Sequence, residues 1–459
     1  MSNRFVGFVG SYSEHFRSYR HDVSKGARQY CCGLMQAGAR KNMDRMAEVV
    51  PEAKSRNLQQ FLTHSRWDAR AVMDHVARDA DAELGDARAT GLLIDESGFS
   101  KQGRKSVGVA RQWLGRLGKV DNGQVAVFGA LACGQRVVPV DARLYLPEEW
   151  TKDPARCRTA GIPEAERRFR TKRELALEVV RHARESKLQF GWVGADAGYG
   201  KGFDFLRALA DDGETFVVDV HSDTRVYLQD PAPRLAERQG RLGRPPTRWQ
   251  SQAKPATVKQ LTDKRPAQRW SSLRLRRTSR GELTVQSFRL PVYIWDGESE
   301  RVDRWTMVVT RVEGEEGDLK ISLSNAPEAT THKELAWRQR QRYWVERAFE
   351  DAKGECGMAD YQVQKWSAWH HHMALVMMSM LFMVREKRLH AKELPLLSCA
   401  DIEELLAEFL PRRSTDKADV LQRIKARHVQ RQRAIDSHSR TSRRRRRSAV
   451  DAVRRRGAS

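Results

Sequence analysis

Hydrophobic positions change their spacing along the 459-residue chain. Up to about residue 88 they recur every three or four residues, for example from Leu58 to Val76, which predicts amphipathic helices. From residue 90 short apolar runs alternate with turn residues, which predicts strands at 91–95, 124–131 and 136–145. We therefore expect a helical N-terminal region followed by an antiparallel meander.

The next segments alternate between the two patterns. Helical spacing over 171–186 and 203–210 is interleaved with strand patterns over 190–195 and 215–220. The order β-β-β-α-β-α-β predicts an α/β core with a mixed sheet of five strands. Pro, Arg, Gln and Lys then dominate to about residue 281, which indicates a linker or an exposed basic insertion, before strand patterns return at 283–290, 305–311 and 319–323.

Helical patterns resume near Thr331 with a long helix, followed by an apolar helix at 373–384 and a polar one at 400–409. The expected regions are a helical N-terminal region (1–88), the first part of the core (89–221), a β-rich basic insertion (222–328), the second part of the core with the long helix (329–390), and a helical C-terminal region with a basic disordered tail (391–459).

The net charge of the chain indicates which class of molecule it binds. The chain has 83 Lys and Arg against 59 Asp and Glu, a net charge of +24, and this excess favours a polyanion such as nucleic acid. The longest apolar run, 373–384, is too short to span a membrane and predicts a buried helix. Residues 1–10 lack a secretion signal, so we expect a cytoplasmic protein associated with the nucleoid of a prokaryotic cell.

Two basic regions are candidates for DNA contact. Residues 1–88 form either a DNA-binding module or a helical cap with a solvated basic face. The arginine runs at 443–447 and 454–456 predict a disordered tail that binds DNA nonspecifically. The six cysteines have no regular spacing, which predicts free thiols, and consecutive residues 370–372, all His, point to different sides of a helix, which argues against a metal site.

The stretch Gly194–Gly202, GADAGYGKG, lacks the first Gly and the final Ser or Thr of a Walker loop, so a nucleotide site is excluded. We infer instead that its small residues make room for a polymer backbone beside Asp196. Lys201 is either a phosphate contact or a solvated lysine.

Three acids stand out by position: Asp95 at the end of the first predicted strand, Asp196 at the end of the fourth, and Glu346 in the long helix. If they converge, they can bind two Mg²⁺ ions for phosphodiester chemistry. The alternatives are a turn role for Asp95, or Glu96 as the working acid on the opposite face of the strand.

The long helix carries acids and bases on one face: Arg342, Glu346, Phe349, Glu350 and Lys353 have helical spacing. In such an arrangement the acid would bind a metal ion while Arg342 and Lys353 bind neighbouring phosphates. An exposed helix with ordinary ion pairs is the alternative interpretation.

Several long segments resemble the insertion-sequence transposases of the DDE superfamily, in the group of insertion sequence 701, which is related to the insertion sequence 4 type. They include LLIDESGFSKQGRKSVGVARQW, LYLPEEWTKDPARCRTAGIP, TKRELALEVV, WVGADAGYG and RYWVERAFEDAKGECGMADYQV, and they extend from about Trp67 to Met373. The resemblance implies an RNase H-like core with a β-rich insertion between the second and third catalytic acids.

Residue by residue, the resemblance makes Asp95, Asp196 and Glu346 the metal-binding triad and matches Arg342 and Lys353 to the Arg and Lys of the signature helix. Relatives carry Tyr seven residues before the Glu, where this chain has Gln339, and Tyr343 is not in register. Ser97 stands where the family often has Thr; either residue suits a turn.

The expected function is Mg²⁺-dependent cleavage and strand transfer at the inverted repeats of a mobile element, with two ions and with Mn²⁺ as a substitute. The expected partners are double-stranded DNA, as transposon ends and target, and a second copy of the chain in a homodimer. The alternatives are an RNase H-like nuclease that cuts without joining, and a domesticated DNA-binding protein that has lost its chemistry.

Overall fold

The computed structural model describes residues 1–235, 247–278, 281–314, 317 and 319–456. The chain forms two compact units, Met1–Leu410 and Pro411–Ser459. No helix in the described ranges has an apolar stretch long enough to cross a bilayer.

The N-terminal region is helical, as its spacing predicts. Its apolar stripes pack together and against the buried helix α13 (Trp366–Leu389), for which the expected burial over 373–384 is confirmed. The elements are α1 (Ser2–Ser11), η1 (Ser13–Phe16), β1 (Arg17–Ser18), β2 (His21–Asp22), α2 (Ser24–Gln36), α3 (Met43–Val49), α4 (Ser55–Thr63) and α5 (Ala69–Leu84).

The core sheet has the strand order of an RNase H-like fold. Its five core strands are β3 (Asp86–Ser100), β5 (Lys119–Cys133), β6 (Arg136–Leu144), β7 (Phe190–Ala195) and β8 (Phe216–Asp219). They lie in the order β6-β5-β3-β7-β8, with β5 antiparallel to both of its neighbours and β3, β7 and β8 parallel. The expected meander and the order β-β-β-α-β-α-β are therefore confirmed.

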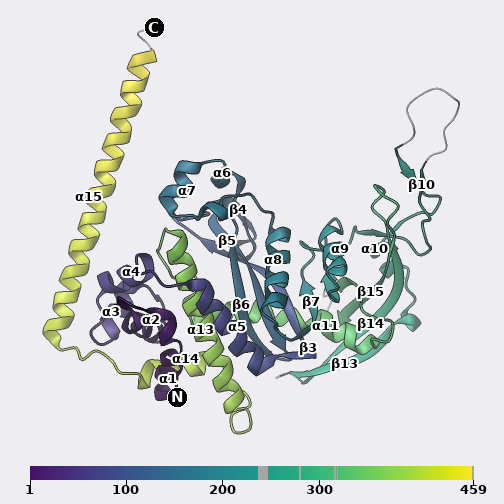
Figure 1. The fold of residues 1–459 in the computed structure, drawn as a ribbon, viewed down its shortest axis with the longest axis horizontal. Coiled ribbons are helices and arrows are strands. Elements are labelled where there is room, and N and C mark those ends of the chain that lie inside the picture. The colour runs from purple at the N-terminus through teal and green to yellow at the C-terminus, as the bar shows by residue number, and fades with distance from the viewer. Residues whose placement is uncertain (236–246, 279–280, 315–316, 318, 457–459) are drawn as a thin grey trace. The chain divides into compact units, whose positions relative to one another are not determined.

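Helices cover both faces of this sheet (Figure 1). α8 (Lys172–Glu185) begins with a capping box between Thr171 and Glu174, and its Val179 packs over Gly129 of β5. On the opposite face, Phe128 of β5 contacts Phe349 of α12 (Tyr343–Gly354), with ring centroids 5.2 Å apart. The remaining helical elements here are η2 (Gly115–Leu117), α6 (Glu148–Thr151), α7 (Pro154–Ala160), η3 (Glu164–Glu166), α9 (Asp204–Asp211), α11 (His332–Gln341) and α14 (Cys399–Phe409).

The five expected core strands are part of a larger sheet of ten strands. β4 (Ala110–Leu114) pairs with β5, and β16 (Leu319–Ser324) pairs with β8, so the insertion continues the core sheet through β15 (Asp303–Val312), β14 (Gly281–Ile294) and β13 (Ser271–Thr278). The exposed edge of β8 supplies the hydrogen-bonding groups for this continuation.

Part of the expected linker also has regular structure. It contains β9 (Arg225–Val226), β10 (Arg234–Leu235), β11 (Trp249–Gln250), β12 (Ala256–Thr257), α10 (Val258–Asp263) and η4 (Ala267–Arg269), and β13 itself begins before residue 281. The sequence pattern did not predict β13 because arginines and serines replace most of the apolar alternation expected of a strand.

The second unit consists mainly of α15 (Lys417–Arg456), so the expectation of a disordered basic tail is wrong over those residues. Arg, Ala, Lys and Gln are strong helix formers and outweigh the repulsion among like charges here. Residues 457–459, the end of the expected tail, lie outside the described residues.

Candidate active site

The parallel ladder between β3 and β7 brings two acids together. Its last pair is Ile94 with Ala195, and Asp95 and Asp196 are the next residue on each strand. Asp95 is not at a strand end as expected, because β3 continues to Ser100 by pairing with β5 alone. Ser97 likewise lies inside the strand rather than in a turn. The parallel ladder with β7, and not the strand itself, ends just before Asp95.

The third acid comes from the helical segment after the insertion. The expected single long helix is two helices, α11 and α12, which meet at Arg342. The contact of Phe349 with Phe128 holds α12 on the face of the sheet that carries Asp95, because Asp95 and Phe128 are register partners. Glu346 lies in the first turn of α12, and its side chain is 50% exposed.

One guanidinium group connects the acids. Arg342 Nη2 lies 2.8 Å from Glu346 Oε1, Nη1 lies 3.5 Å from Asp95 Oδ2, and Nε lies 3.3 Å from Oδ2 of a fourth acid, Asp219. Asp219 ends β8 and is largely buried. The sequence reasoning missed it, although an acid at the end of the fifth predicted strand was a signal of the same kind as Asp196.

Burial and mutual repulsion dominate the electrostatics. Burial raises the pKa of Asp95 from 3.8 to about 7; Asp196 and Glu346 raise it further, while Arg342 opposes them. Burial also raises the pKa of Asp219, again against Arg342. Burial disfavours the charged guanidinium, yet Asp219, Asp95, Glu346 and Asp196 together raise the pKa of Arg342. The region thus concentrates negative charge around Arg342, and Lys320 of β16 also lowers the pKa of Asp219.

Comparison with known proteins agrees with this architecture. The family model described as "DDE superfamily endonuclease" matches residues 12–282. The chain belongs to the DDE superfamily of endonucleases. A probable transposase for insertion sequence element IS701 from Microchaete diplosiphon is 30% identical over 228 residues, which are 49% of this chain and 56% of the relative. The chain therefore aligns with little more than half the length of that relative.

The matched range of the DDE endonuclease model includes Asp95 and Asp196 but ends before Glu346. The convergence of Glu346 with the other acids is therefore an observation of the structure. Within the described residues, no three His, Cys, Asp or Glu side chains are already arranged around one metal position. The guanidinium of Arg342 lies among the acids instead, and the carboxylate donors themselves are of the type that Mg²⁺ prefers.

The two expected lysine contacts differ in position. Lys353 is half-buried on α12, with Nζ 5.8 Å from the Phe99 ring centroid; burial lowers its pKa, and Asp95 acts in the opposite direction. Lys201 is exposed and lines a groove with both acids and bases, including Asp204, Arg225 and Asp296. Lys353 thus interacts electrostatically with Asp95, whereas no contact within the described residues joins Lys201 to the acid cluster.

Glu96 lies on the other face of β3, as strand alternation predicts, where it forms an ion pair with Lys172 of α8. The glycines after Asp196 also shape the turn that follows it. Gly200 lies against the backbone of β8, since a Cβ there would come within 2.2 Å of the Asp219 carbonyl oxygen. Gly198 donates its N–H to Asp196 Oδ1 at 2.9 Å. Gly198 itself is exposed beside the acid.

Gln339 is a buried structural residue of α11. Its Oε1 accepts from Thr310 Oγ1 at 2.6 Å, and its Nε2 donates to Ser322 Oγ at 2.7 Å and to the Val308 carbonyl at 3.2 Å. Tyr343, by contrast, is 46% exposed. The hydrogen bonds of Gln339 join α11 to the insertion strands β15 and β16.

Next to Arg342, an arginine and two aromatic rings form a surface. The Arg276 guanidinium of β13 lies 4.3 Å from the Trp344 ring centroid and 5.3 Å from that of Tyr343. Its Nε and Nη1 are buried without a hydrogen-bond partner. We refer to Arg276, Tyr343 and Trp344 as the stacked surface.

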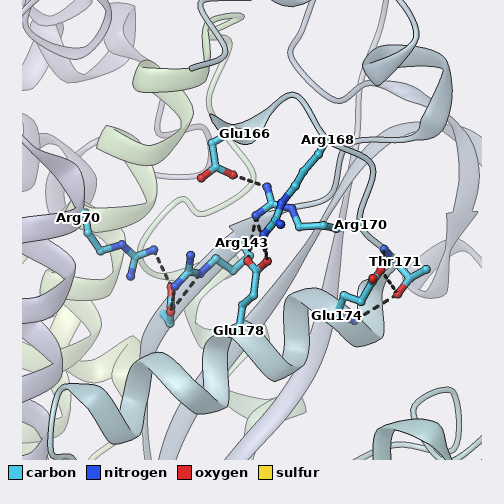
Figure 2. Close-up of polar contacts among 9 residues, drawn as sticks. Arg70, Arg143, Glu166, Arg168, Arg170, Thr171, Glu174 and Glu178 are labelled. Atoms are coloured by element: carbon cyan, nitrogen blue, oxygen red, sulfur yellow. Dashed lines mark hydrogen bonds and ion pairs between the residues drawn. The ribbon is translucent and has the colours of Figure 1, made fainter. Parts of the chain in front are cut away.

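A separate cavity of about 510 Å³ is lined by Arg70, Arg143 and Arg170, but their charges are already balanced. Arg70 pairs with both Asp74 and Asp141, and Arg143 also pairs with Asp141. Figure 2 shows Arg168 and Arg170 directed at Glu178 of α8, with Glu166 also on Arg170, so four acids face the four arginines. This network ties the loop before α8 to the helix. It does not offer a free anion site.

The histidine cluster and the cysteines have core roles. His371 interacts with the carbonyls of Leu62 and Trp67, and His372 with the Tyr30 hydroxyl. All six cysteines are free, which confirms the expectation from their spacing.

Proposed function

We propose that the chain is a DNA transposase that cuts and joins DNA at the ends of a mobile element, with Asp95, Asp196 and Glu346 as its metal-binding acids. The observation that carries the proposal is the convergence of carboxylates from β3, β8 and α12 on the guanidinium of Arg342, with Asp196 at the adjacent strand end. In an open sheet with parallel strands, ligands bind beyond the carboxyl ends of those strands, which is where these acids lie.

Two Mg²⁺ ions, or Mn²⁺ in their place, would activate the attacking oxygen and stabilise the leaving one. The carboxylates of Asp95, Asp196 and Glu346 would hold the ions, with Asp95 largely buried and Glu346 half exposed. Arg342 and Lys353 lie on the same face of α12 and would bind the phosphates on either side of the scissile one.

The DNA would extend from the acids over the stacked surface. Arg276 stacks on the Trp344 ring, and Tyr343 beside it presents an exposed ring. An exposed aromatic ring of this kind can stack on a base. Helix α15 would add affinity that does not depend on sequence, since residues 411–459 contain 17 Lys and Arg against four Asp. A homodimer would bring two DNA ends together.

The test compares Asp95→Asn, Asp196→Asn and Glu346→Gln with Glu350→Gln, an exposed acid on the same helix. With DNA carrying the inverted repeats that flank the gene and with Mg²⁺, we expect each of the first three to lose at least about a thousandfold in cleavage rate, because each removes a metal ligand. Glu350→Gln should cleave normally, and all four should bind the DNA in a gel-shift assay.

The products decide between the proposal and its alternatives. Joined strands in a sequencing gel support transposition, whereas cut ends without joining support an RNase H-like nuclease. Wild-type chain that binds the ends but never cuts them in Mg²⁺ or Mn²⁺ would support a DNA-binding protein without catalysis. Cleavage by the Asp95→Asn variant at the wild-type rate would overturn the assignment of the acids.

A further inference from the structure

Asp219 is held in place from two sides. It ends β8 in register with Ser322 of β16, and the Ser322 hydroxyl donates to Asp219 Oδ1. The same hydroxyl accepts from Gln339 Nε2 at 2.7 Å, and Gln339 lies about one turn before Arg342. The carboxylate is therefore fixed by the insertion and by α11, and its side chain is only 14% exposed.

The contacts of Arg342 are divided between the edges of its guanidinium. Asp219 lies 3.3 Å from Nε in an ion pair that lacks hydrogen-bond geometry, whereas Asp95 and Glu346 face the two Nη groups at 3.5 and 2.8 Å. Asp95 and Glu346 belong to the proposed metal ligands, and Asp219 does not. Arg342 must leave Asp95 and Glu346 when those carboxylates bind divalent ions, because cations at such short distances repel each other strongly. Asp219 is not one of the proposed metal ligands, so Nε can stay beside it when the ions bind.

We propose that Asp219 is a positioning residue that anchors Arg342 by its Nε. The anchor keeps the Nη groups beside the acids. Before metal binds, the Nη groups neutralise Asp95 and Glu346; after metal binds, they contact an anion instead. A guanidinium held at one edge loses less conformational entropy when its other edge binds a phosphate oxygen. The identity of that anion as DNA phosphate rests on the proposed function; the anchoring itself does not.

Gln339 connects α11 to this arrangement. Its Nε2 donates to the Ser322 hydroxyl, which in turn donates to Asp219. The buried series Gln339, Ser322, Asp219 and Arg342 therefore links the inside of α11 to the acids. Its members come from α11, β16 and β8 and from the junction of α11 with α12.

The test is a double-mutant cycle on Mn²⁺ binding by the metal-free full chain, measured by isothermal titration calorimetry without DNA. Asp219→Asn should weaken Mn²⁺ binding about tenfold, because Arg342, released from Asp219, settles on Asp95 and Glu346 and competes with the ion. In the Arg342→Gln background the same substitution should change the affinity less than about twofold. Asp211→Asn, an exposed acid of α9, is the control for the general loss of one negative charge.

An equal weakening by Asp219→Asn in both backgrounds would mean that Asp219 acts on the ion directly, and would overturn the proposal. No weakening in either background would overturn it as well. If Asp219→Asn melts at a much lower temperature in EDTA, Ser322→Ala serves instead, since it removes the hydrogen bond and keeps the carboxylate. It should give a smaller effect in the same direction, again absent with Arg342→Gln.

A DNA assay separates this inference from the proposed function. With end DNA, Asp219→Glu should recover most of the cleavage that Asp219→Asn loses, since it restores a carboxylate near Nε. If the wild-type chain cleaves no DNA, the proposed function fails, but the Mn²⁺ cycle still decides whether Asp219 positions Arg342.

Discussion

Asp95→Asn is expected to make the metal-free protein more stable while it removes cleavage. The folded chain holds the Asp95 proton more tightly than the unfolded chain, because the pKa is raised from 3.8 to about 7 by burial and by Asp196 and Glu346. The stability of the wild-type protein therefore falls as pH rises through this interval and stays at the lower value above it. Asn cannot ionise, so the variant lacks this loss.

The magnitude follows from the interval between the two pKa values. Asp95 is 9% exposed, so solvent screens the effect little. Each pKa unit corresponds to about 1.36 kcal/mol. The free energy of unfolding of Asp95→Asn should therefore exceed that of the wild type by about 4 kcal/mol at pH 8 and by about half of that at pH 5.5. The free energy of unfolding is measured by urea denaturation in EDTA at both pH values.

Asp121→Asn is the matched control, since Asp121 is a partly exposed acid of β5 whose pKa is lowered by the Asn122 N–H. The Asp121→Asn variant should have no higher free energy of unfolding than the wild type at pH 8. An Asp95→Asn variant that is no more stable than the wild type at pH 8, or whose gain is the same at pH 5.5, would refute the electrostatic account of this site.

Three further outcomes are expected. Gln339→Ala should lower the free energy of unfolding by about 2–3 kcal/mol in urea, because it leaves buried hydrogen-bonding partners unsatisfied; an unchanged midpoint would contradict the network. Gly129→Ala should cost about 1–3 kcal/mol in the same assay, since its Cβ would lie 2.5 Å from Val179 Cγ1 of α8. Arg276→Ala should weaken binding of end DNA about tenfold in a fluorescence-anisotropy titration, whereas Arg274→Ala, on an exposed part of the same strand, should have a smaller effect. Equal losses for the two arginines would argue against the stacked surface.

The sequence by itself determined the core and two of its acids. Alternation with period two and spacing of three or four are local properties, so the order β-β-β-α-β-α-β could be read directly. Because successive parallel strands present the same end at the same edge, an acid after the fourth strand was expected near one on the first. Asp95 and Asp196 lie as that argument requires, one residue beyond the last pair of their ladder.

Only the tertiary structure decided how the insertion and the helices complete the site. The pairing of β16 with β8 joins residues about a hundred positions apart, and no local pattern records which edge an added strand will choose. The same pairing fixes Asp219 beside Ser322, and packing of α12 on β5 decides that Arg342 reaches it. A carboxylate that looks ordinary in its strand therefore gains its role from contacts between distant segments, which form only when the chain folds.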